Sequence, residues 1–261
     1  MERLRVQKGV SMIETLEINK IHLGDSYELI KQIPDNSIDC IYTDVPYLYQ
    51  KGGVGHSKLG QRMGKKKDEI LNISDGIDYS ILEDFVRVTK KINIYIWCSE
   101  MQIRPLLNWF YQNKGINGKF IFWGKTNPSP MTNQRWLPDT EICLYFRESG
   151  VVLNNNYEYK STFFISSLNV DDKKQFNHPT IKPLNFVKKH LLHTTQENDV
   201  VLDCFSGSGT TCVAAKELNR QFIGIEIDKN YHKISVDRLN GINANGQTSI
   251  FTDFEKEYYH E

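Results

Sequence analysis

"VLDCFSGSGTTCVAAKEL", residues 201–218, decides the fold of this chain. A hydrophobic run ends at Asp203, a turn containing Gly207 and Gly209 follows, and a helical pattern begins at Thr210. Glycine lets a backbone approach a ligand closely, and a helix N-terminus presents free N–H groups with a positive dipole end. The stretch therefore predicts a strand, a ligand-binding turn and a helix.

The next apolar run along the chain supports a nucleoside at this turn. "FIGIEIDKNY", residues 222–231, reads as a strand that ends near Glu226. An acid at the tip of such a strand can accept hydrogen bonds from both hydroxyls of a ribose. The turn has the form F-x-G-x-G from Phe205 and lacks the lysine of a phosphate-binding P-loop. A glycine turn alone often binds nothing, but the pairing with Glu226 favours a nucleoside-bearing cofactor.

The rest of the chain alternates between strand and helix patterns. Short apolar runs predict strands at 18–24, 38–43, 92–98, 119–124, 141–146, 199–205 and 222–227. Amphipathic patterns predict helices at 79–91, 100–113, 183–195, 209–219 and 229–240. Near-continuous apolar strands between helices indicate an α/β fold with a doubly wound, mostly parallel sheet. Such sheets bind ligands beyond the carboxyl ends of their strands.

Composition sets the broad class of protein. A chain of 261 residues with 39% hydrophobic content can bury the core of one domain. It contains no long apolar run and no signal-peptide pattern, so we expect a soluble cytoplasmic protein with no membrane partner. Its five cysteines include no C-x-x-C pair, which favours reduced core thiols over disulfides or a metal site.

Charge is balanced overall but uneven along the chain. The formal net charge is zero, yet "KGGVGHSKLGQRMGKKK", residues 51–67, has basic residues and no acid. These basic residues are Lys51, Lys58, Arg62, Lys65, Lys66 and Lys67. The glycines favour a mobile loop over residues 50–76. Two interpretations stay open, a solvated loop and a loop that contacts phosphates.

Three further segments complete the domain organisation. Residues 147–177 are rich in Asn and Ser, have no clear helical period, and predict an insertion or small subdomain on the sheet. Residues 1–17 and 242–261 read as a poorly held N-terminal extension and C-terminal tail. The predicted single domain is residues 18–241.

A second candidate site lies at "IYTDVPYLYQ", residues 41–50. The apolar strand pattern ends at Asp44 and is followed by Val45, Pro46 and Tyr47. Asp and Pro are ordinary turn residues, so this stretch taken alone could be a simple β-turn. The other patterns in the chain favour a functional interpretation.

Taken together, these stretches resemble one enzyme family. Residues 44–47, "DVPY", are similar to the D-P-P-Y motif of the DNA amino-methyltransferases that use S-adenosylmethionine. "DCFSGSGTT", residues 203–211, resembles the cofactor loop of that family, and "NHPTIKPLNFVKKHL", residues 177–191, resembles its H-P-x-x-K-P segment. "FWGKTNPSP", residues 122–130, also follows the family pattern. The resemblance covers about residues 18–240 and is closest to the group whose catalytic motif precedes its cofactor motif.

The resemblance implies a fold, a cofactor and a role for each motif residue. It implies a Rossmann-like methyltransferase sheet that binds S-adenosylmethionine and acts on double-stranded DNA. The implied catalytic residues are Asp44, Val45, Pro46 and Tyr47. The implied cofactor-binding residues are Asp203, Phe205, Gly207, Gly209, Thr210, Glu226, Asp25 and Lys182. Asp25 fits a helix cap equally well, and Lys182 fits either a cofactor contact or a structural role.

Residues 44 and 45 bear on the reaction. The family usually has proline where this chain has Val45, but the catalytic acceptor there is a backbone carbonyl, so we expect an active enzyme. Family members that act on cytosine N4 more often have serine at position 44, so Asp44 favours adenine N6. Alternatives left open are cytosine N4, RNA, a small molecule, and a catalytically silent DNA-binding homologue.

Target choice and partners follow from the segments outside the common core. The basic stretch is a candidate for DNA phosphates, and residues 147–177 are a candidate for base edges through Asn and Lys side chains. The insertion is short, which favours a short target or help from a second protomer. The sequence shows no acid cluster suited to a nuclease, so any cognate restriction endonuclease is expected to be a separate polypeptide.

Overall fold

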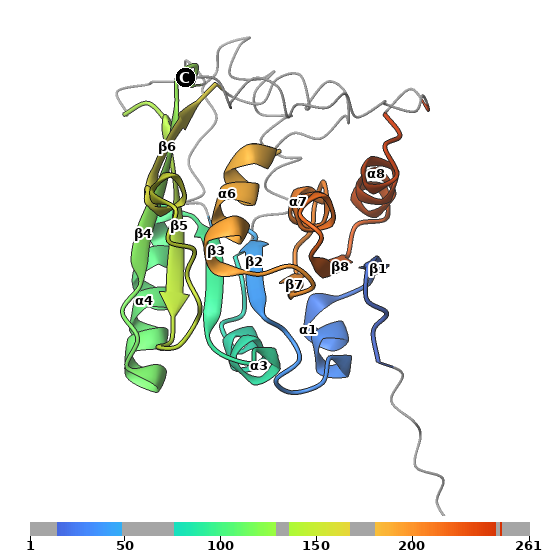
Figure 1. Cartoon of the computed structure of the whole chain (residues 1–261), viewed down its shortest axis with the longest axis horizontal. Coiled ribbons are helices and arrows are strands. Elements are labelled where there is room, and N and C mark those ends of the chain that lie inside the picture. The colour runs from blue at the N-terminus through green and yellow to red at the C-terminus, as the bar shows by residue number, and fades with distance from the viewer. Residues whose placement is uncertain (1–14, 49–75, 129–135, 168–180, 244–245, 247–261) are drawn as a thin grey trace, which may run out of the picture.

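The structure is a computed structural model that describes residues 15–48, 76–128, 136–167, 181–243 and 246. Its centre is an eight-stranded sheet with the order β1-β8-β7-β2-β3-β5-β4-β6 (Figure 1). The strands are β1 (Lys20–Leu23), β2 (Cys40–Asp44), β3 (Asn93–Cys98), β4 (Lys119–Lys125), β5 (Thr140–Arg147), β6 (Phe163–Ser166), β7 (Val200–Asp203) and β8 (Gln221–Glu226). Among these described strands, β5 alone runs against its neighbours, β3 and β4.

Helices cover both faces of the sheet. They are α1 (Ser26–Leu29), α3 (Ile81–Val88), α4 (Glu100–Lys114), α6 (Leu184–Thr194), α7 (Thr210–Glu217) and α8 (Lys229–Leu239). Two short 3-10 helices are η1 (Ile30–Gln32) and η2 (Tyr157–Lys160). Figure 1 shows α6, α7 and α8 in one row and α4, α3 and α1 in another.

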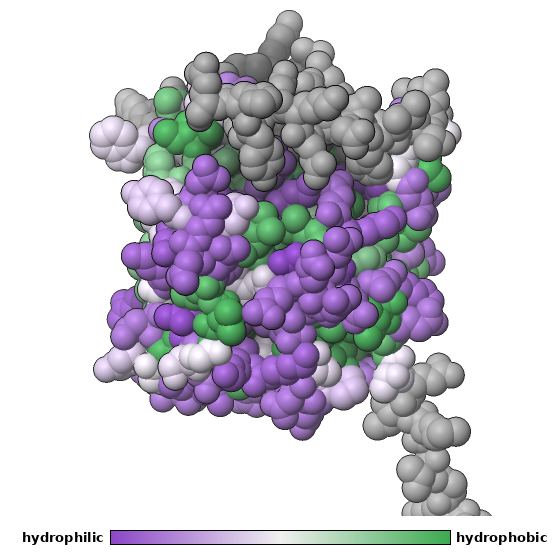
Figure 2. All heavy atoms as spheres, in the orientation of Figure 1, coloured by the Kyte–Doolittle hydropathy of each residue, from purple (hydrophilic) through white to green (hydrophobic). Residues whose placement is uncertain are grey.

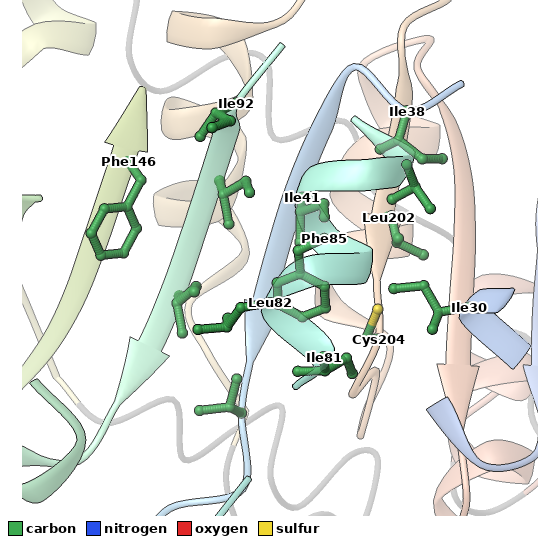
Figure 3. Packing of buried hydrophobic residues seen from close by; sticks show 14 of the residues in the cluster. Ile30, Ile38, Ile41, Ile81, Leu82, Phe85, Ile92, Phe146, Leu202 and Cys204 are labelled. Carbon is green, nitrogen blue, oxygen red and sulfur yellow. The ribbon is translucent and has the colours of Figure 1, made fainter. Parts of the chain in front are cut away.

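The period of the strands explains the two layers of the core. Side chains alternate between faces along a strand. In β3, Ile94 and Ile96 join the buried cluster that packs against α1, α3 and α4. Tyr95 and Trp97 join a second cluster, which packs against α6 and α7. Figure 3 shows the first cluster, where Phe85 and Leu82 of α3 lie over β2.

The chain order places a switch point between β2 and β7. From β2 the chain proceeds through α3 to β3 on one side, and from β7 it proceeds through α7 to β8 on the other. The two strands are parallel neighbours, with Ile41 opposite Leu202. Because ligands bind outside the carboxyl ends of strands at such a point, the sheet directs attention to the ends of β2 and β7.

The seven predicted strands and five predicted helices are all present close to their expected bounds, which confirms the doubly wound α/β prediction. Among the described elements, the short α1, the edge strand β6 and the two 3-10 helices went unpredicted. β6 lies inside the predicted insertion 147–177 and pairs in parallel with β4, so this part of the insertion extends the main sheet. The rest of that segment beyond residue 167 lies outside the described residues, as do residues 1–14 and 49–75.

The cysteines and the described surface are the remaining features of the fold. All five cysteines are buried and free, as predicted. The face seen in Figure 2 is largely hydrophilic where residues are described, with scattered apolar areas. Among the described helices, none combines the length and the apolar character that a bilayer crossing requires.

Candidate active site

Strand β2 carries Asp44 to the carboxyl edge of the sheet, and helix α4 holds the turn that follows. The Val45 N–H donates to the Trp97 carbonyl across 3.3 Å. The buried Gln102 of α4 donates through Nε2 to the Pro46 carbonyl at 2.9 Å. Ser99, the N-cap of α4, donates through its hydroxyl to the Leu48 carbonyl at 3.0 Å. The turn after Asp44 is therefore fixed by contacts to β3 and α4.

The two carboxylate oxygens of Asp44 have different surroundings. Oδ2 lies 2.6 Å from the ammonium nitrogen of Lys182, which comes from the segment just before α6. Oδ1 is buried and accepts no hydrogen bond from any described residue. A buried carboxylate oxygen without a donor is costly, so Oδ1 is a ready acceptor for a ligand N–H.

Lys182 links Asp44 to a second acid. Its Nζ lies 2.8 Å from Oε2 of Glu141 at the start of β5, and Oε1 of Glu141 lies 2.7 Å from Nζ of Lys125 at the end of β4. The Tyr47 hydroxyl donates to Glu141 Oε2 at 3.3 Å and accepts from Lys182 at 3.3 Å. Two acids and two lysines thus form one chain of alternating charge.

Burial and neighbouring charges shift the pKa values of Asp44, Glu141 and Lys182 in different directions. Burial raises the pKa of Asp44, and nearby Lys182 only partly offsets that rise. Burial alone would also raise the pKa of Glu141, but the ammonium groups of Lys182 and Lys125 lower it to about 2. Burial would lower the pKa of Lys182, yet the two carboxylates raise it above its usual range.

The predicted cofactor loop begins at the end of β7, the strand next to β2 and its Asp44. Asp203, at the end of β7, is buried, and its Oδ1 accepts from the Thr43 hydroxyl at 2.9 Å and from the Phe205 N–H at 3.2 Å. Burial raises the pKa of Asp203 to about 7. Since Thr43 precedes Asp44, the ends of β2 and β7 form one site at the switch point.

Glu226 closes the cofactor loop from the next strand. Its buried carboxylate accepts from the Gly207 N–H at 2.7 Å and from the Asp228 N–H at 2.9 Å. Burial raises the pKa of Glu226. Each carboxylate oxygen has more than one lone pair, so Glu226 can hold the loop and still accept hydroxyl donors. The predicted strand-tip acid is thus placed beside the glycine turn.

The glycines of the loop are required by backbone geometry. Gly209 is the N-cap of α7 and has φ +75°, a conformation that favours glycine, and a Cβ there would lie 2.9 Å from the Ser235 Cβ. The Thr210 hydroxyl accepts from the buried Arg238 guanidinium at 2.7 Å, so this side chain anchors the start of α7. Because the Thr210 side chain has this partner, the part of Thr210 that is suited to a ligand is its backbone at the helix N-terminus.

Asp25 has a local structural role. It is the N-cap of α1 and accepts from the Tyr27 N–H at 2.9 Å. Its carboxylate lines a groove of about 740 Å³ between α1 and α3, together with Tyr27 and Asp78. That groove contains neither Asp44 nor Glu226. The cap interpretation of Asp25 is confirmed, and a cofactor contact stays a prediction.

Sequence reasoning missed Glu141, Lys125 and Gln102. Glu141 precedes an apolar run and Lys125 ends one, so each looked like the polar boundary of a strand. Only the strand register could have revealed them. With β5 antiparallel, the Glu141 and Lys125 side chains lie on the same face of the sheet as Trp97. The six basic residues predicted to bind DNA, Lys51 to Lys67, lie outside the described residues.

Comparison with known proteins finds one family. Residues 38–237 match the family model described as DNA methylase, an N6/N4 methyltransferase model. The chain is 33% identical over 240 residues to the type II methyltransferase M2.LlaDCHI of Lactococcus lactis subsp. cremoris, covering 83% of this chain and 87% of that protein. It is 30% identical over 243 residues to the type II methyltransferase M2.DpnII of Streptococcus pneumoniae, covering 84% and 89%.

Solved structures agree with this match. The crystal structure of the M1.HpyAVI–SAM complex is 30% identical, covers 85% of this chain and 98% of that chain, and superposes with a TM-score of 0.62. The cytosine-N4-specific PvuII DNA methyltransferase superposes with a TM-score of 0.64 at 17% identity, which shows a shared fold alone.

Proposed function

The chain belongs to the DNA methylase family, and we propose that it transfers a methyl group from S-adenosylmethionine to the N6 amino group of adenine in a short sequence of double-stranded DNA. One observation carries the choice of reaction. Asp44 presents a buried, donor-free oxygen at the switch point, beside the loop between Asp203 and Glu226.

The proposed chemistry activates a poor nucleophile. The lone pair of an exocyclic amino nitrogen is delocalised into the base. Asp44 Oδ1 and the Val45 carbonyl accept hydrogen bonds from the two amino N–H groups. The nitrogen therefore becomes pyramidal, and its lone pair is no longer delocalised into the base. Both acceptors also stabilise the positive charge that develops on this nitrogen, and they therefore act mainly on the transition state.

The target base has to leave the duplex to reach these acceptors. Flipping costs a few kcal/mol of stacking and pairing, which contacts in the pocket offset. We assign stacking on the base to Tyr47, which lies in the turn after Asp44 and donates its hydroxyl to Glu141. Pro46 shapes the turn, and its carbonyl is fixed by Gln102.

The residues present fit the cofactor. S-adenosylmethionine supplies a methyl group on a sulfonium, an electrophile that needs no metal ion. Glu226 has acceptor capacity for the ribose hydroxyls, and Gly207 and Gly209 allow a close backbone approach. The Phe205 ring and the acidic Asp203 lie at the same turn and suit a cationic, partly apolar ligand. Holding the donor in line with the amino nitrogen supplies the proximity effect.

We predict N6-methyladenine in one short DNA motif. The protein is expressed in a methylation-deficient bacterial host, and its genomic DNA is read by single-molecule sequencing. Asp44→Ala should abolish the mark, since it removes the acceptor and its charge. Asp35→Ala is a matched control, because Asp35 pairs with Arg87 at the opposite edge of the sheet and should leave methylation intact.

Other results would redirect the proposal. Modified cytosine would keep the mechanism but overturn the choice of adenine. Unmodified DNA in the presence of folded protein that binds S-adenosylmethionine would contradict DNA methylation and favour an RNA substrate or a silent DNA-binding homologue.

The proposed partners extend beyond the target duplex. We assign DNA phosphates to the basic stretch 51–67, and base edges to the segment after β5. The short length of that segment supports a second copy of this chain on the DNA. A cognate restriction endonuclease is proposed as a separate polypeptide. Sedimentation of the protein with and without duplex tests for the second copy of this chain. Co-purification with the product of a neighbouring gene tests for the endonuclease.

A further inference from the structure

The chain of alternating charge beside Asp44 is built from four separate elements. Asp44 ends β2, Lys125 ends β4, Glu141 lies at the start of β5, and Lys182 precedes α6. Lys182 and Lys125 are almost fully buried, with side chains 10% and 11% exposed. Burying charges is costly, so an arrangement of this kind needs close pairing to persist.

The Lys182 ammonium has an acceptor for each of its three donors. A lysine ammonium has three N–H donors. Its three acceptors here are Asp44 Oδ2 at 2.6 Å, Glu141 Oε2 at 2.8 Å and the Tyr47 hydroxyl at 3.3 Å. The ammonium also lies 4.9 Å from the centre of the Trp97 ring. With Lys182 fixed, Asp44 Oδ2 is fixed, and the donor-free Oδ1 has a defined direction.

Glu141 also controls how much positive charge Asp44 receives. Lys182 shares its charge between two carboxylates, and Lys125 pairs with the other oxygen of Glu141. A lysine devoted to Asp44 alone would neutralise it more strongly and weaken it as an acceptor. Without Lys182, two buried carboxylates would face each other, which favours protonation of one of them.

We propose that Lys182 and Glu141 are positioning residues, which fix the direction and the charge of Asp44 for the target amino group, with Lys125 anchoring Glu141. The inference rests on the proposed function and deepens it. It differs from the role in cofactor binding that the family resemblance suggested for Lys182. Neither residue needs to touch the methyl donor.

The groups that face Asp44 are known from every packed element. Among the described residues, they are Lys182, Glu141, Tyr47, Tyr42, Asp203, Cys98 and Cys143. Burial raises the pKa of both thiols, so they stay neutral. Burial raises the pKa of Asp44, Lys182 lowers it and Glu141 raises it. Loss of the Lys182 charge should therefore raise this pKa, and loss of the Glu141 charge should lower it.

The test is the pH dependence of single-turnover methylation. The substrate is a duplex carrying the motif found by sequencing, with tritiated S-adenosylmethionine, from about pH 5 to pH 9. In Lys182→Met, the acid limb should shift upward by about 1 to 3 pH units. In Glu141→Gln, it should shift downward, and the plateau rate should fall by about 10-fold or more because Lys182 then neutralises Asp44 alone and weakens it as an acceptor.

Matched controls are available on the same elements. Lys188→Met removes a lysine of α6 that pairs with Glu217, and Glu148→Gln removes an acid just beyond the other end of β5. Both should leave the acid limb in place. Calorimetric titration with S-adenosylmethionine should give wild-type affinity in Glu141→Gln, because its role lies on the target side.

The outcomes separate the two levels of the proposal. An active wild type whose acid limb is unmoved in both variants would overturn the positioning role alone, since a merely structural role lowers the rate equally at every pH. A wild type that binds cofactor but transfers no methyl group overturns the proposed function and this inference with it. If Lys182→Met fails to fold, the downward shift in Glu141→Gln decides the question.

Discussion

At the scale of residues, Val45 stands where the catalytic motif that this chain resembles usually has proline. Its N–H donates to the Trp97 carbonyl at 3.3 Å, a bond that the usual proline could not make. Its side chain is buried, and the following Pro46 biases it towards an extended backbone. The rigidity that proline would supply is thus replaced by a ladder hydrogen bond and core packing, and the carbonyl acceptor is retained.

The Asp203 carboxyl makes the stability of the folded protein depend on pH, and an asparagine in its place should remove this dependence. Its pKa is about 7 in the folded chain, because of burial, and an unfolded aspartate has a pKa of about 3.9. The folded state therefore holds the extra proton between these values, so stability falls as pH rises through this window and levels off above about 7. An asparagine side chain in this place cannot ionise, yet it keeps an oxygen acceptor for Thr43 and Phe205.

We therefore expect Asp203→Asn to gain stability relative to wild type as pH rises. The gain should be at most about 3 kcal/mol between pH 5 and pH 8. Urea unfolding of the ligand-free protein at both pH values measures it, and the difference between the two proteins removes contributions from all other groups. A difference that does not change with pH would show that Asp203 is already ionised at pH 5.

At the scale of elements, α4 positions the proposed catalytic turn through its capping box. Gln102 accepts from the Ser99 N–H through Oε1 and donates to the Pro46 carbonyl through Nε2. Because Gln102 is fully buried, Gln102→Ala leaves both partners without a bond and should lower the free energy of unfolding by about 2 to 4 kcal/mol.

The same change should also lower the methylation rate, since the turn after Asp44 loses its anchor. Gln112→Ala, on an exposed position of the same helix, is the control and should change stability by less than about 0.5 kcal/mol. Chemical unfolding and single-turnover assays on both variants check the prediction. Equal stability of the two variants would mean that water replaces the Gln102 bonds.

The elements also show what the sequence could predict and what it could not. Asp44, Asp203 and Glu226 each follow an apolar run, so their places at strand ends could be read from a local pattern. Glu141 and Lys182 could not be linked to Asp44 in this way, because their contact depends on the antiparallel turn of β5 and on where α6 begins. β6 was missed because its apolar run, Phe163–Ile165, is only three residues long and lies in a segment rich in Asn and Ser.

At the scale of the whole molecule, DNA binding has to arise from the distribution of charge. The 32 basic and 32 acidic residues cancel, so the protein as a whole has no net attraction for a polyanion. The basic stretch 51–67 follows the proposed catalytic turn closely in the chain. Local positive charge beside the site can hold phosphates in spite of overall neutrality.

This distribution predicts a specific salt effect for Lys65, Lys66 and Lys67, which lie outside the described residues. Each phosphate contact adds about 0.9 to the slope of log affinity against log salt, so replacing all three by Gln should flatten the slope by up to about 3 and weaken binding to every sequence alike. The control replaces Lys91, Lys114 and Lys119 by Gln, because these residues lie near the opposite, amino edge of β3 and β4. Fluorescence anisotropy of a labelled duplex at several salt concentrations measures both triple variants. An equal slope in wild type and the Lys65–Lys67 variant would exclude these lysines from the DNA interface, and the neutral charge of the chain would then require other cations at the carboxyl edge.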